Sequence, residues 1–238
     1  MKKEWIQKGK GDRLLVFFAG WGQDVHPFSQ LQAENWDVLM LYDYNDLNLP
    51  VAKSEISRYK NAELVAWSLG VWVASQMPTE WLSSFRTRIA VNGTLMPIDE
   101  HLGIPPVIFD GTIANFSQVT RQKFFRRMCG SYFQQYQKFS PLRSLESQCE
   151  ELKQFRIKVA DEWISSSAFD KALVCSEDLI FPAKHQLQFW GEELNVPTKQ
   201  LPLPHFPFYR WETWDSMMVE LLSPEGFFLR QDKVAEQW

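Results

Sequence analysis

The sequence predicts an α/β fold: a mostly parallel sheet covered by helices, with a helical cap insertion. Apolar runs of strand length recur along the chain without alternation, which indicates strands buried on both faces. Helical segments separate these runs, an order typical of parallel α/β sheets. With 238 residues, 45% of them hydrophobic, the chain is long enough for a large domain with a sizeable core.

Five buried strands and one weaker strand are expected in chain order. The buried runs cover residues 13–19, 37–42, 63–67, 88–91 and 171–175. The weaker run, residues 200–203, contains Pro202 and is therefore expected at a sheet edge, because proline lacks an N–H for the ladder. Helices are expected over residues 27–33, 71–77 and 184–190.

A different pattern occupies residues 110–162. It contains no convincing strand, has no acidic residue between Thr120 and Leu145, and spaces its aromatic residues at helical intervals, at Phe116, Phe124, Phe125, Phe133 and Phe139. We interpret it as a helical cap inserted into a core made of residues 1–109 and 163–238. An insertion after the fourth expected strand would lie over the carboxyl ends of the strands, where open α/β sheets bind ligands.

Residues 62–74, A-E-L-V-A-W-S-L-G-V-W-V-A, carry the strongest functional signal. They predict a strand, a sharp turn at Ser68 and a helix, the context of a nucleophile elbow. The small residues Ala66 and Gly70 on either side of the serine allow the strand and helix to approach. The alternative is a serine that merely caps a helix after a buried strand.

A serine nucleophile on this architecture needs an acid and then a histidine later in the chain. His205, in L-P-L-P-H-F-P-F, follows the last strand, and Asp178 follows the fifth in S-E-D-L-I-F-P, with Glu177 as its rival. The alternatives are a packed or solvated histidine, and a turn or helix-cap carboxylate. The order Ser68, Asp178, His205, each after a strand, favours a catalytic triad.

An oxyanion site requires main-chain donors near the developing charge. The N–H of Leu69, directly after the serine, is one candidate. The other is the N–H of Trp21, in the Gly20-Trp21-Gly22 turn after the first expected strand. The alternative is a glycine turn without a catalytic role.

Composition excludes several classes of function. A net charge of -4 offers no general attraction for nucleic acid. The N-terminus lacks the apolar region of a secretory signal, and no stretch approaches the roughly 18 apolar residues of a membrane span. Cys129, Cys149 and Cys175 are odd in number and lack C-x-x-C spacing, which disfavours disulfides and a zinc site. A cytoplasmic protein that does not bind membranes is expected.

Four stretches together resemble the α/β-hydrolase superfamily: A-G-W-G, W-S-L-G, S-E-D-L-I-F-P and P-H-F-P. More narrowly, F-F-A-G-W-G and A-W-S-L-G-V-W-V-A resemble the BioG family of pimeloyl-[acyl-carrier protein] methyl ester esterases. The resemblance extends from Leu14 to about Leu222. Ala66 replaces the first glycine of the usual elbow, and Ala19 stands where many relatives have histidine, which leaves open how the oxyanion turn is braced.

The resemblance implies hydrolysis of the methyl ester of pimeloyl-[acyl-carrier protein] methyl ester, with release of methanol, in biotin biosynthesis. Ser68 would attack, His205 would transfer the proton and Asp178 would orient the imidazole, with the N–H groups of Trp21 and Leu69 as oxyanion donors. No metal ion or organic cofactor is implied.

An acyl-carrier protein is the implied partner, and because carriers are strongly acidic, its docking needs a local basic surface. The cap contains candidates for that surface in Arg121, Lys123, Arg126 and Arg127, whose alternative role is a solvated helix face. Other functions remain open: a general carboxylesterase, an acyl thioesterase, or a catalytically silent α/β-hydrolase-fold binding protein.

Overall fold

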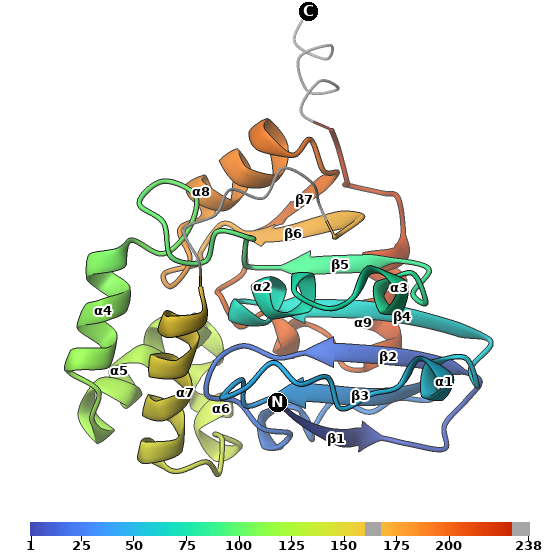
Figure 1. Ribbon diagram of the computed structural model, residues 1–238, viewed down its shortest axis with the longest axis horizontal. Coiled ribbons are helices and arrows are strands. Elements are labelled where there is room, and N and C mark those ends of the chain that lie inside the picture. The colour runs from blue at the N-terminus through green and yellow to red at the C-terminus, as the bar shows by residue number, and fades with distance from the viewer. Residues whose placement is uncertain (160–167, 230–238) are drawn as a thin grey trace, which may run out of the picture.

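A twisted sheet forms the centre of the computed structural model, which describes residues 1–159 and 168–229 (Figure 1). Its seven strands follow the order β1-β3-β2-β4-β5-β6-β7. Six strands run parallel to one another, and β1 pairs antiparallel with β3. Their bounds are β1 Lys2–Gln7, β2 Arg13–Phe18, β3 Trp36–Tyr42, β4 Asn61–Trp67, β5 Arg88–Val91, β6 Lys171–Cys175 and β7 Thr198–Leu201.

The five buried strands expected from the sequence are confirmed, with small shifts at their ends. The weak sixth strand is β7, which lies at the sheet edge as expected but ends before Pro202. β1 was not predicted, because its sequence K-K-E-W-I-Q is charged at its start and none of its residues is fully buried. An edge strand of this kind has no apolar run to reveal it.

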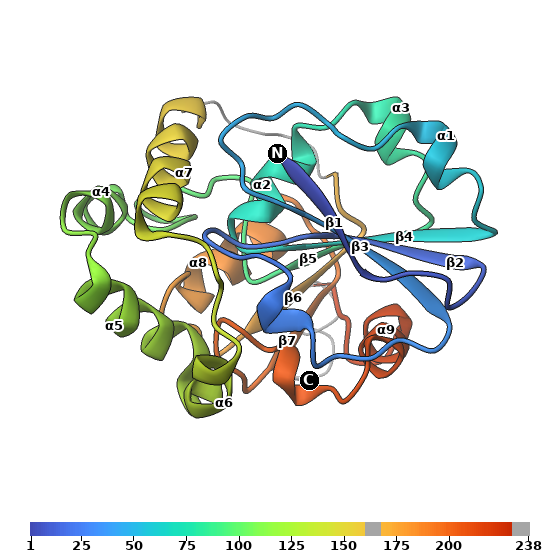
Figure 2. The ribbon, with the colours of Figure 1, turned by 90° about the horizontal axis from the view of Figure 1, so that it is seen from below.

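Side chains of β2 alternate between the two core layers on either side of the sheet. Leu14, Val16 and Phe18 enter one layer, and Leu15 and Phe17 enter the other. Figure 2 shows α1 (Lys53–Ile56), α2 (Leu69–Ser75) and α3 (Thr79–Leu82) on one face and α9 (Trp214–Leu222) on the other. Both faces of the sheet are therefore buried, as its continuous apolar strands require.

Among the described residues between β5 and β6, four helices lie beyond the carboxyl ends of the parallel strands (Figures 1 and 2). They are α4 (Pro106–Ala114), α5 (Gln118–Cys129), α6 (Phe133–Lys138) and α7 (Leu145–Lys158), with a 3₁₀ turn, η2 (Gly130–Tyr132), before α6. We call these helices the cap layer. The helical run begins at Pro106, before the expected start at Asp110, and the expected end at Glu162 lies outside the described residues. The division into a core and a cap domain stays a prediction.

The helices of the core differ from expectation in detail. The expected helix over residues 27–33 is wrong: only a 3₁₀ turn, η1 (His26–Phe28), forms there, because Gln32 extends to make a β-bridge with Thr213. The helix expected over residues 71–77 is α2. The one expected over 184–190 is α8 (Ala183–Leu187) continued by a π-helix, η3 (Gln188–Glu193). A 3₁₀ turn, η4 (Phe208–Arg210), precedes α9.

Candidate active site

Ser68 occupies a strained turn between β4 and α2. Its main chain has φ 59° and ψ -129°, a conformation that residues with a side chain rarely adopt. The Ser68 side chain makes no capping hydrogen bond to α2, so the helix-cap alternative is wrong. A Cβ on Gly70 would lie 2.4 Å from the carbonyl oxygen of Ala19. The glycine after the serine therefore allows α2 to touch the end of β2.

His205 links the serine to a carboxylate. Its Nε2 lies 2.9 Å from Ser68 Oγ, and its Nδ1 lies 2.6 Å from Asp178 Oδ2. All three residues are buried, His205 with 1% of its surface exposed. Because the carboxylate accepts the hydrogen on Nδ1, Nε2 is left free to accept the serine proton. Glu177, the rival acid, is exposed.

Asp178 also acts as a turn carboxylate. Its Oδ1 accepts hydrogen bonds from the main-chain N–H groups of Ile180 and Phe181 at 2.8 and 2.7 Å, and Gln186 Nε2 donates to Oδ2 at 3.1 Å. The turn role and the triad geometry therefore occur in the same side chain. The main-chain donors orient the carboxylate toward the imidazole.

Two residues that were not predicted hold the His205 loop. Trp67 Nε1 donates to the carbonyl oxygen of His205 at 2.8 Å, and Asn92 Nδ2 donates to the same oxygen at 2.9 Å. Asn92 also accepts from the main-chain N–H of Cys175 at 2.8 Å and has a left-handed φ of 48°. The N-G-T turn after β5 was the available signal, because asparagine tolerates such a φ.

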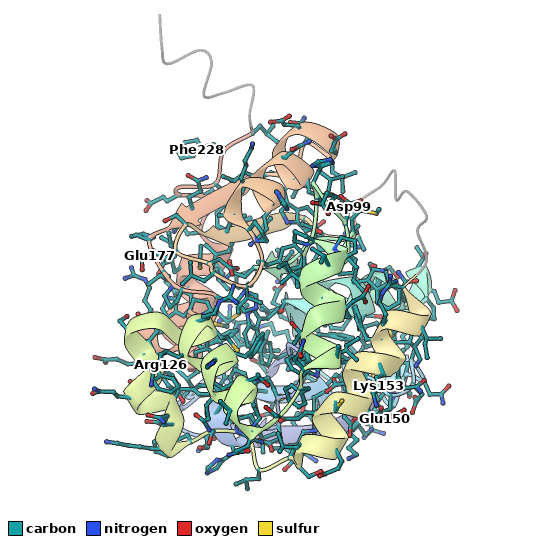
Figure 3. The ribbon with its side chains drawn as sticks, turned by 90° about the vertical axis from the view of Figure 1, so that its left-hand side faces the viewer. Asp99, Arg126, Glu150, Lys153, Glu177 and Phe228 are labelled. Carbon is teal, nitrogen blue, oxygen red and sulfur yellow. The ribbon has the colours of Figure 1, made fainter. Side chains whose placement is uncertain are left out.

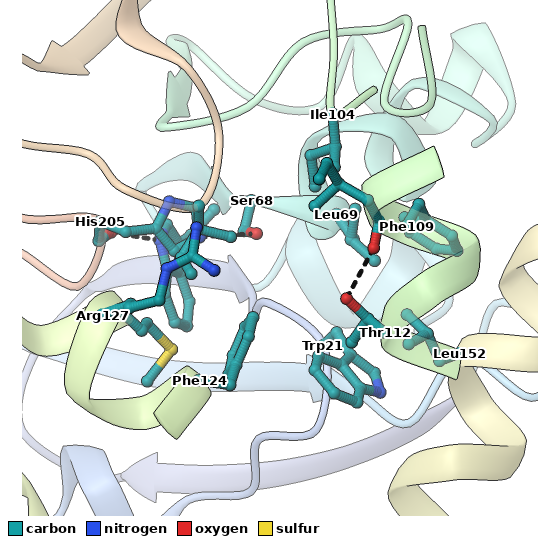
Figure 4. A pocket seen from close by; sticks show the side chains of 14 residues that line it. Trp21, Ser68, Leu69, Ile104, Phe109, Thr112, Phe124, Arg127, Leu152 and His205 are labelled. Carbon is teal, nitrogen blue, oxygen red and sulfur yellow. Dashed lines mark hydrogen bonds between the residues drawn. The ribbon is translucent and has the colours of Figure 1, made fainter. Parts of the chain in front are cut away.

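A largely apolar cavity opens beside Ser68 and His205, between the sheet and the cap layer (Figure 4). Trp21 and Leu69, the expected oxyanion residues, line it. The N–H of Leu69 is the first of α2 and has no partner within the helix. The other lining residues are Trp67, Ile104, Ile108, Phe109, Thr112, Phe124, Arg127, Met128, Leu152 and Ile180.

The four basic residues expected to form a docking surface do not share one surface. Lys123, Arg126 and Arg127 are all exposed, and Arg127 also lines the cavity and donates to the carbonyl oxygen of Leu179 at 2.8 Å. Arg121 turns inward and its Nη1 donates to Gln148 Oε1 at 3.2 Å. The register of α5 directs the Arg121 side chain toward α7, and the docking role of the four residues stays a prediction.

Other chemistry-bearing groups give no second site. Within residues 1–159 and 168–229, no group of three or more His, Cys, Asp or Glu side chains could hold a metal ion. Burial raises the pKa of the Cys175 thiol to about 12, which leaves it protonated and unreactive at neutral pH. In the same ranges no helix is long and apolar enough to cross a membrane.

A serine, a histidine and a carboxylate joined by hydrogen bonds, at the carboxyl end of a mostly parallel sheet, define an ester hydrolase of the α/β-hydrolase fold. Residues 1–217 match the family model described as "Pimeloyl-ACP methyl esterase BioG". The chain belongs to this family.

The chain is similar to three individual proteins that differ in identity and length. A crystal structure of BioG from Haemophilus influenzae has a TM-score of 0.78 and 35% identity, covering 91% of this chain and 99% of that one. A malonyl-[acyl-carrier protein] O-methyltransferase of Bacteroides fragilis is 41% identical over 76% of this chain, which spans 37% of that protein's length. A lipase-esterase related protein from Clostridium acetobutylicum shares the fold, with a TM-score of 0.59 at 13% identity, covering 93% of this chain and 98% of that one.

Proposed function

We propose that this protein hydrolyses the methyl ester of pimeloyl-[acyl-carrier protein] methyl ester to pimeloyl-[acyl-carrier protein] and methanol, a step of biotin biosynthesis. The observation that carries the proposal is the 2.9 Å contact between Ser68 Oγ and His205 Nε2 at an apolar cavity, in a chain of the BioG family. An apolar cavity beside the nucleophile suits the methylene chain of a pimeloyl group.

The proposed reaction passes through an acyl-enzyme. Ser68 Oγ attacks the ester carbonyl while His205 takes its proton, and the resulting oxyanion is stabilised by main-chain N–H groups. His205 then returns the proton to the methoxy oxygen, and methanol leaves. Water, deprotonated by the same imidazole, hydrolyses the Ser68 ester, releases the carboxylic acid and regenerates the serine. Asp178 stabilises the imidazolium at both steps. The proposed reaction uses no cofactor.

An acyl-carrier protein is the proposed partner, and Lys123 and Arg126 are the proposed docking cations. Figure 3 faces the cap layer and shows Arg126 at its outer surface, on the opposite side from Glu150 and Lys153 of α7. Lys123 and Arg126 line a groove with the apolar side chains of Val119 and Phe133. Arg127 is exposed as well and lines the cavity that contains Ser68 and His205. Positive charge on this side of the cap complements the acidic surface of a carrier.

Hydrolysis of the methyl-pimeloyl carrier by the wild-type protein and by Ser68→Ala, followed by mass spectrometry of the carrier, tests the reaction. With the wild type, the mass of the carrier should fall by about 14 mass units, one methylene group, as the methyl ester becomes the acid. With Ser68→Ala, the mass of the carrier should not change. Turnover that survives Ser68→Ala would refute the nucleophile. Turnover of simple esters without turnover of the carrier ester would refute the substrate and leave a general esterase.

The docking surface is tested with the double variant Lys123→Glu/Arg126→Glu. We expect kcat/KM on the carrier ester to fall by about tenfold or more, because charge reversal repels an acidic partner. Hydrolysis of a small p-nitrophenyl ester should be unchanged. Lys153→Glu, an exposed charge change on α7, is the matched control and should alter neither reaction. Equal losses on both substrates in the double variant would contradict docking at this surface. The cytoplasmic location expected from the sequence stays a prediction.

A further inference from the structure

The turn that carries Trp21 is bound to the cap layer rather than supported by the core alone. The main-chain N–H of Gly22 donates to Glu151 Oε2 at 3.0 Å, and the carbonyl oxygen of Gly22 accepts from Gln148 Nε2 at 2.7 Å. The indole Nε1 of Trp21 donates to the carbonyl oxygen of Gln148 at 2.6 Å. Two side chains one turn apart on α7 therefore hold the main chain of this turn on both its donor and its acceptor side.

These contacts are close to the reacting serine. A Cβ added to Gly20 would lie 3.1 Å from Ser68 Cβ, so the turn and the nucleophile are in direct packing contact. Gly22 has a φ of 74°, which favours glycine, and a Cβ there would lie 3.3 Å from Gln148 Nε2. The position of this turn is thus set by hydrogen bonds that only a close approach of α7 permits.

Glu151 is a buried carboxylate with a full set of donors. Its exposed fraction is 1%; Oε1 accepts from the main-chain N–H of Tyr44 at 3.0 Å, and Oε2 accepts from Arg143 Nη1 at 2.6 Å. Burial raises the pKa of Glu151, while Arg143 and the N–H groups of Tyr44 and Gly22 oppose that shift. Arg143 is itself buried and pairs with Asp43 at 2.9 Å.

A buried ion pair of this kind is weak evidence for stability, since apolar replacement of both partners is often neutral or stabilising. What Glu151 supplies instead is position: one carboxylate binds the turn after β2 through Gly22 and the loop after β3 through Tyr44. The hydroxyl of Tyr44 in turn donates to the carbonyl oxygen of Ala19 at 2.7 Å. Arg121 completes the arrangement, because its bond to Gln148 Oε1 fixes which end of that amide faces Gly22.

We propose that Glu151 and Gln148 of α7 are positioning residues that hold the Gly20-Trp21-Gly22 turn in the geometry in which the Trp21 N–H meets the oxyanion. The oxyanion site is then completed by the cap. This inference rests on the proposed esterase function and extends it. It also explains how the turn is braced in a chain that has Ala19 in place of a histidine.

The test separates positioning from stability with a paired replacement. Glu151→Leu/Arg143→Met removes both buried charges, while Asp43 keeps its ion pair with Lys2 at 2.8 Å. We expect the double variant to fold with lower thermal stability, because the N–H groups of Gly22 and Tyr44 lose their acceptor, while Asp43 keeps Lys2 as its counter-ion. The kcat for a p-nitrophenyl ester should fall about 10- to 100-fold, somewhat less than the loss of a whole oxyanion donor. KM should stay within about twofold, because ground-state binding is not affected.

Affinity for a trifluoromethyl ketone is the decisive readout. This inhibitor forms a tetrahedral oxyanion on the serine, so its Ki should rise by the same factor as kcat falls. A merely structural defect would lower the number of active sites found by burst titration and leave Ki unchanged in the remainder, which would overturn the proposal. An unchanged kcat in the folded double variant would overturn it as well.

Two further variants sharpen the comparison. Glu151→Gln can turn its amide so that the oxygen still accepts from Gly22 and Arg143, although its amide nitrogen then faces the N–H of Tyr44. Because the bond to Gly22 is kept, kcat should fall less than in the double variant. Arg156, also on α7, makes an exposed ion pair with Asp110 of α4. Arg156→Leu breaks that pair and should change neither kcat nor Ki. The p-nitrophenyl ester makes this test independent of the carrier. Failure on the carrier ester would refute the proposed substrate, and unchanged Ki in the double variant would refute the positioning role.

Discussion

Replacing Asp178 by asparagine should abolish most activity while leaving the fold intact. Oδ1 of Asp178 accepts from the N–H groups of Ile180 and Phe181, so the asparagine must keep its carbonyl oxygen at that position. Its amide nitrogen then replaces Oδ2, at 2.6 Å from His205 Nδ1. A donor there forces Nδ1 to be the acceptor and places the hydrogen on Nε2. The imidazole can then no longer accept the proton of Ser68.

The magnitude follows from the wrong tautomer. The same substitution in a serine protease triad lowers kcat by about 10⁴, and we expect a similar loss, equivalent to about 5 kcal/mol in the barrier. The geometry should survive, although Gln186 Nε2 then faces an amide nitrogen in place of the oxygen to which it donates at 3.1 Å. Steady-state hydrolysis of a p-nitrophenyl ester, with circular dichroism as a check of folding, measures the effect.

Glu177→Gln is the matched control, since it makes the same chemical change in the neighbouring, exposed carboxylate. It should alter kcat by less than about twofold. A folded Asp178→Asn protein that kept more than about a tenth of wild-type kcat would refute the role of Asp178 in setting the tautomer. A large loss in Glu177→Gln would move that role to the rival acid.

Four other substitutions test the structure at the site and elsewhere in the fold. Gly70→Ala places a Cβ 2.4 Å from the carbonyl oxygen of Ala19, and it should lower the free energy of unfolding in urea by about 1–3 kcal/mol. Gly111→Ala is the control: a Cβ there has no heavy atom within 4 Å, and alanine should stabilise α4 by up to about 1 kcal/mol. Equal effects of the two would contradict the close approach at the elbow. Trp67→Phe removes a donor to the carbonyl oxygen of the triad histidine, so kcat should fall by up to about tenfold, and an unchanged kcat would show that the remaining donor suffices. Oε2 of Glu63 is buried without a hydrogen-bond partner, and burial raises the pKa of this carboxyl above 4.5. The folded state therefore binds the proton more tightly than the unfolded state does, and the protein loses stability as the pH rises from about 4.5 through the folded pKa. In Glu63→Gln the melting temperature should therefore fall less over this pH range than it does in the wild type. Identical profiles of melting temperature against pH in the two proteins would refute the raised pKa.

The cap layer has two proposed functions. Its outer side, with Lys123 and Arg126, is proposed to meet the carrier, whereas its inner side holds the turn after β2 through Gln148 and Glu151. Arg121 illustrates the distinction. Its charge predicted a docking role, but its contact with Gln148 places it in the inner set. The two functions are separable by experiment, because carrier and small-ester substrates respond to different variants.

Local sequence determined the positions of the strands and the order of the three candidate catalytic residues along the chain. Apolar runs without alternation are a local property, and for this reason β2 to β6 could be located within a few residues. The serine, acid and histidine could be found because each follows a strand and the order along the chain is constrained by the fold. The helix over residues 27–33 was wrong because Gln32 bridges to Thr213, a partner that no local pattern reveals.

Tertiary structure alone decided how distant residues cooperate. Ser68 and His205 are 137 residues apart, and Gly22 and Glu151 are 129 apart, so their contacts depend on how the sheet and the cap pack. In the sequence Glu151 is one of several acids on an amphipathic helix, and nothing distinguishes it from its neighbours. Its burial and its donors arise only when α7 lies against the turn after β2. Side-chain partners across elements follow from packing geometry, which periodicity does not encode.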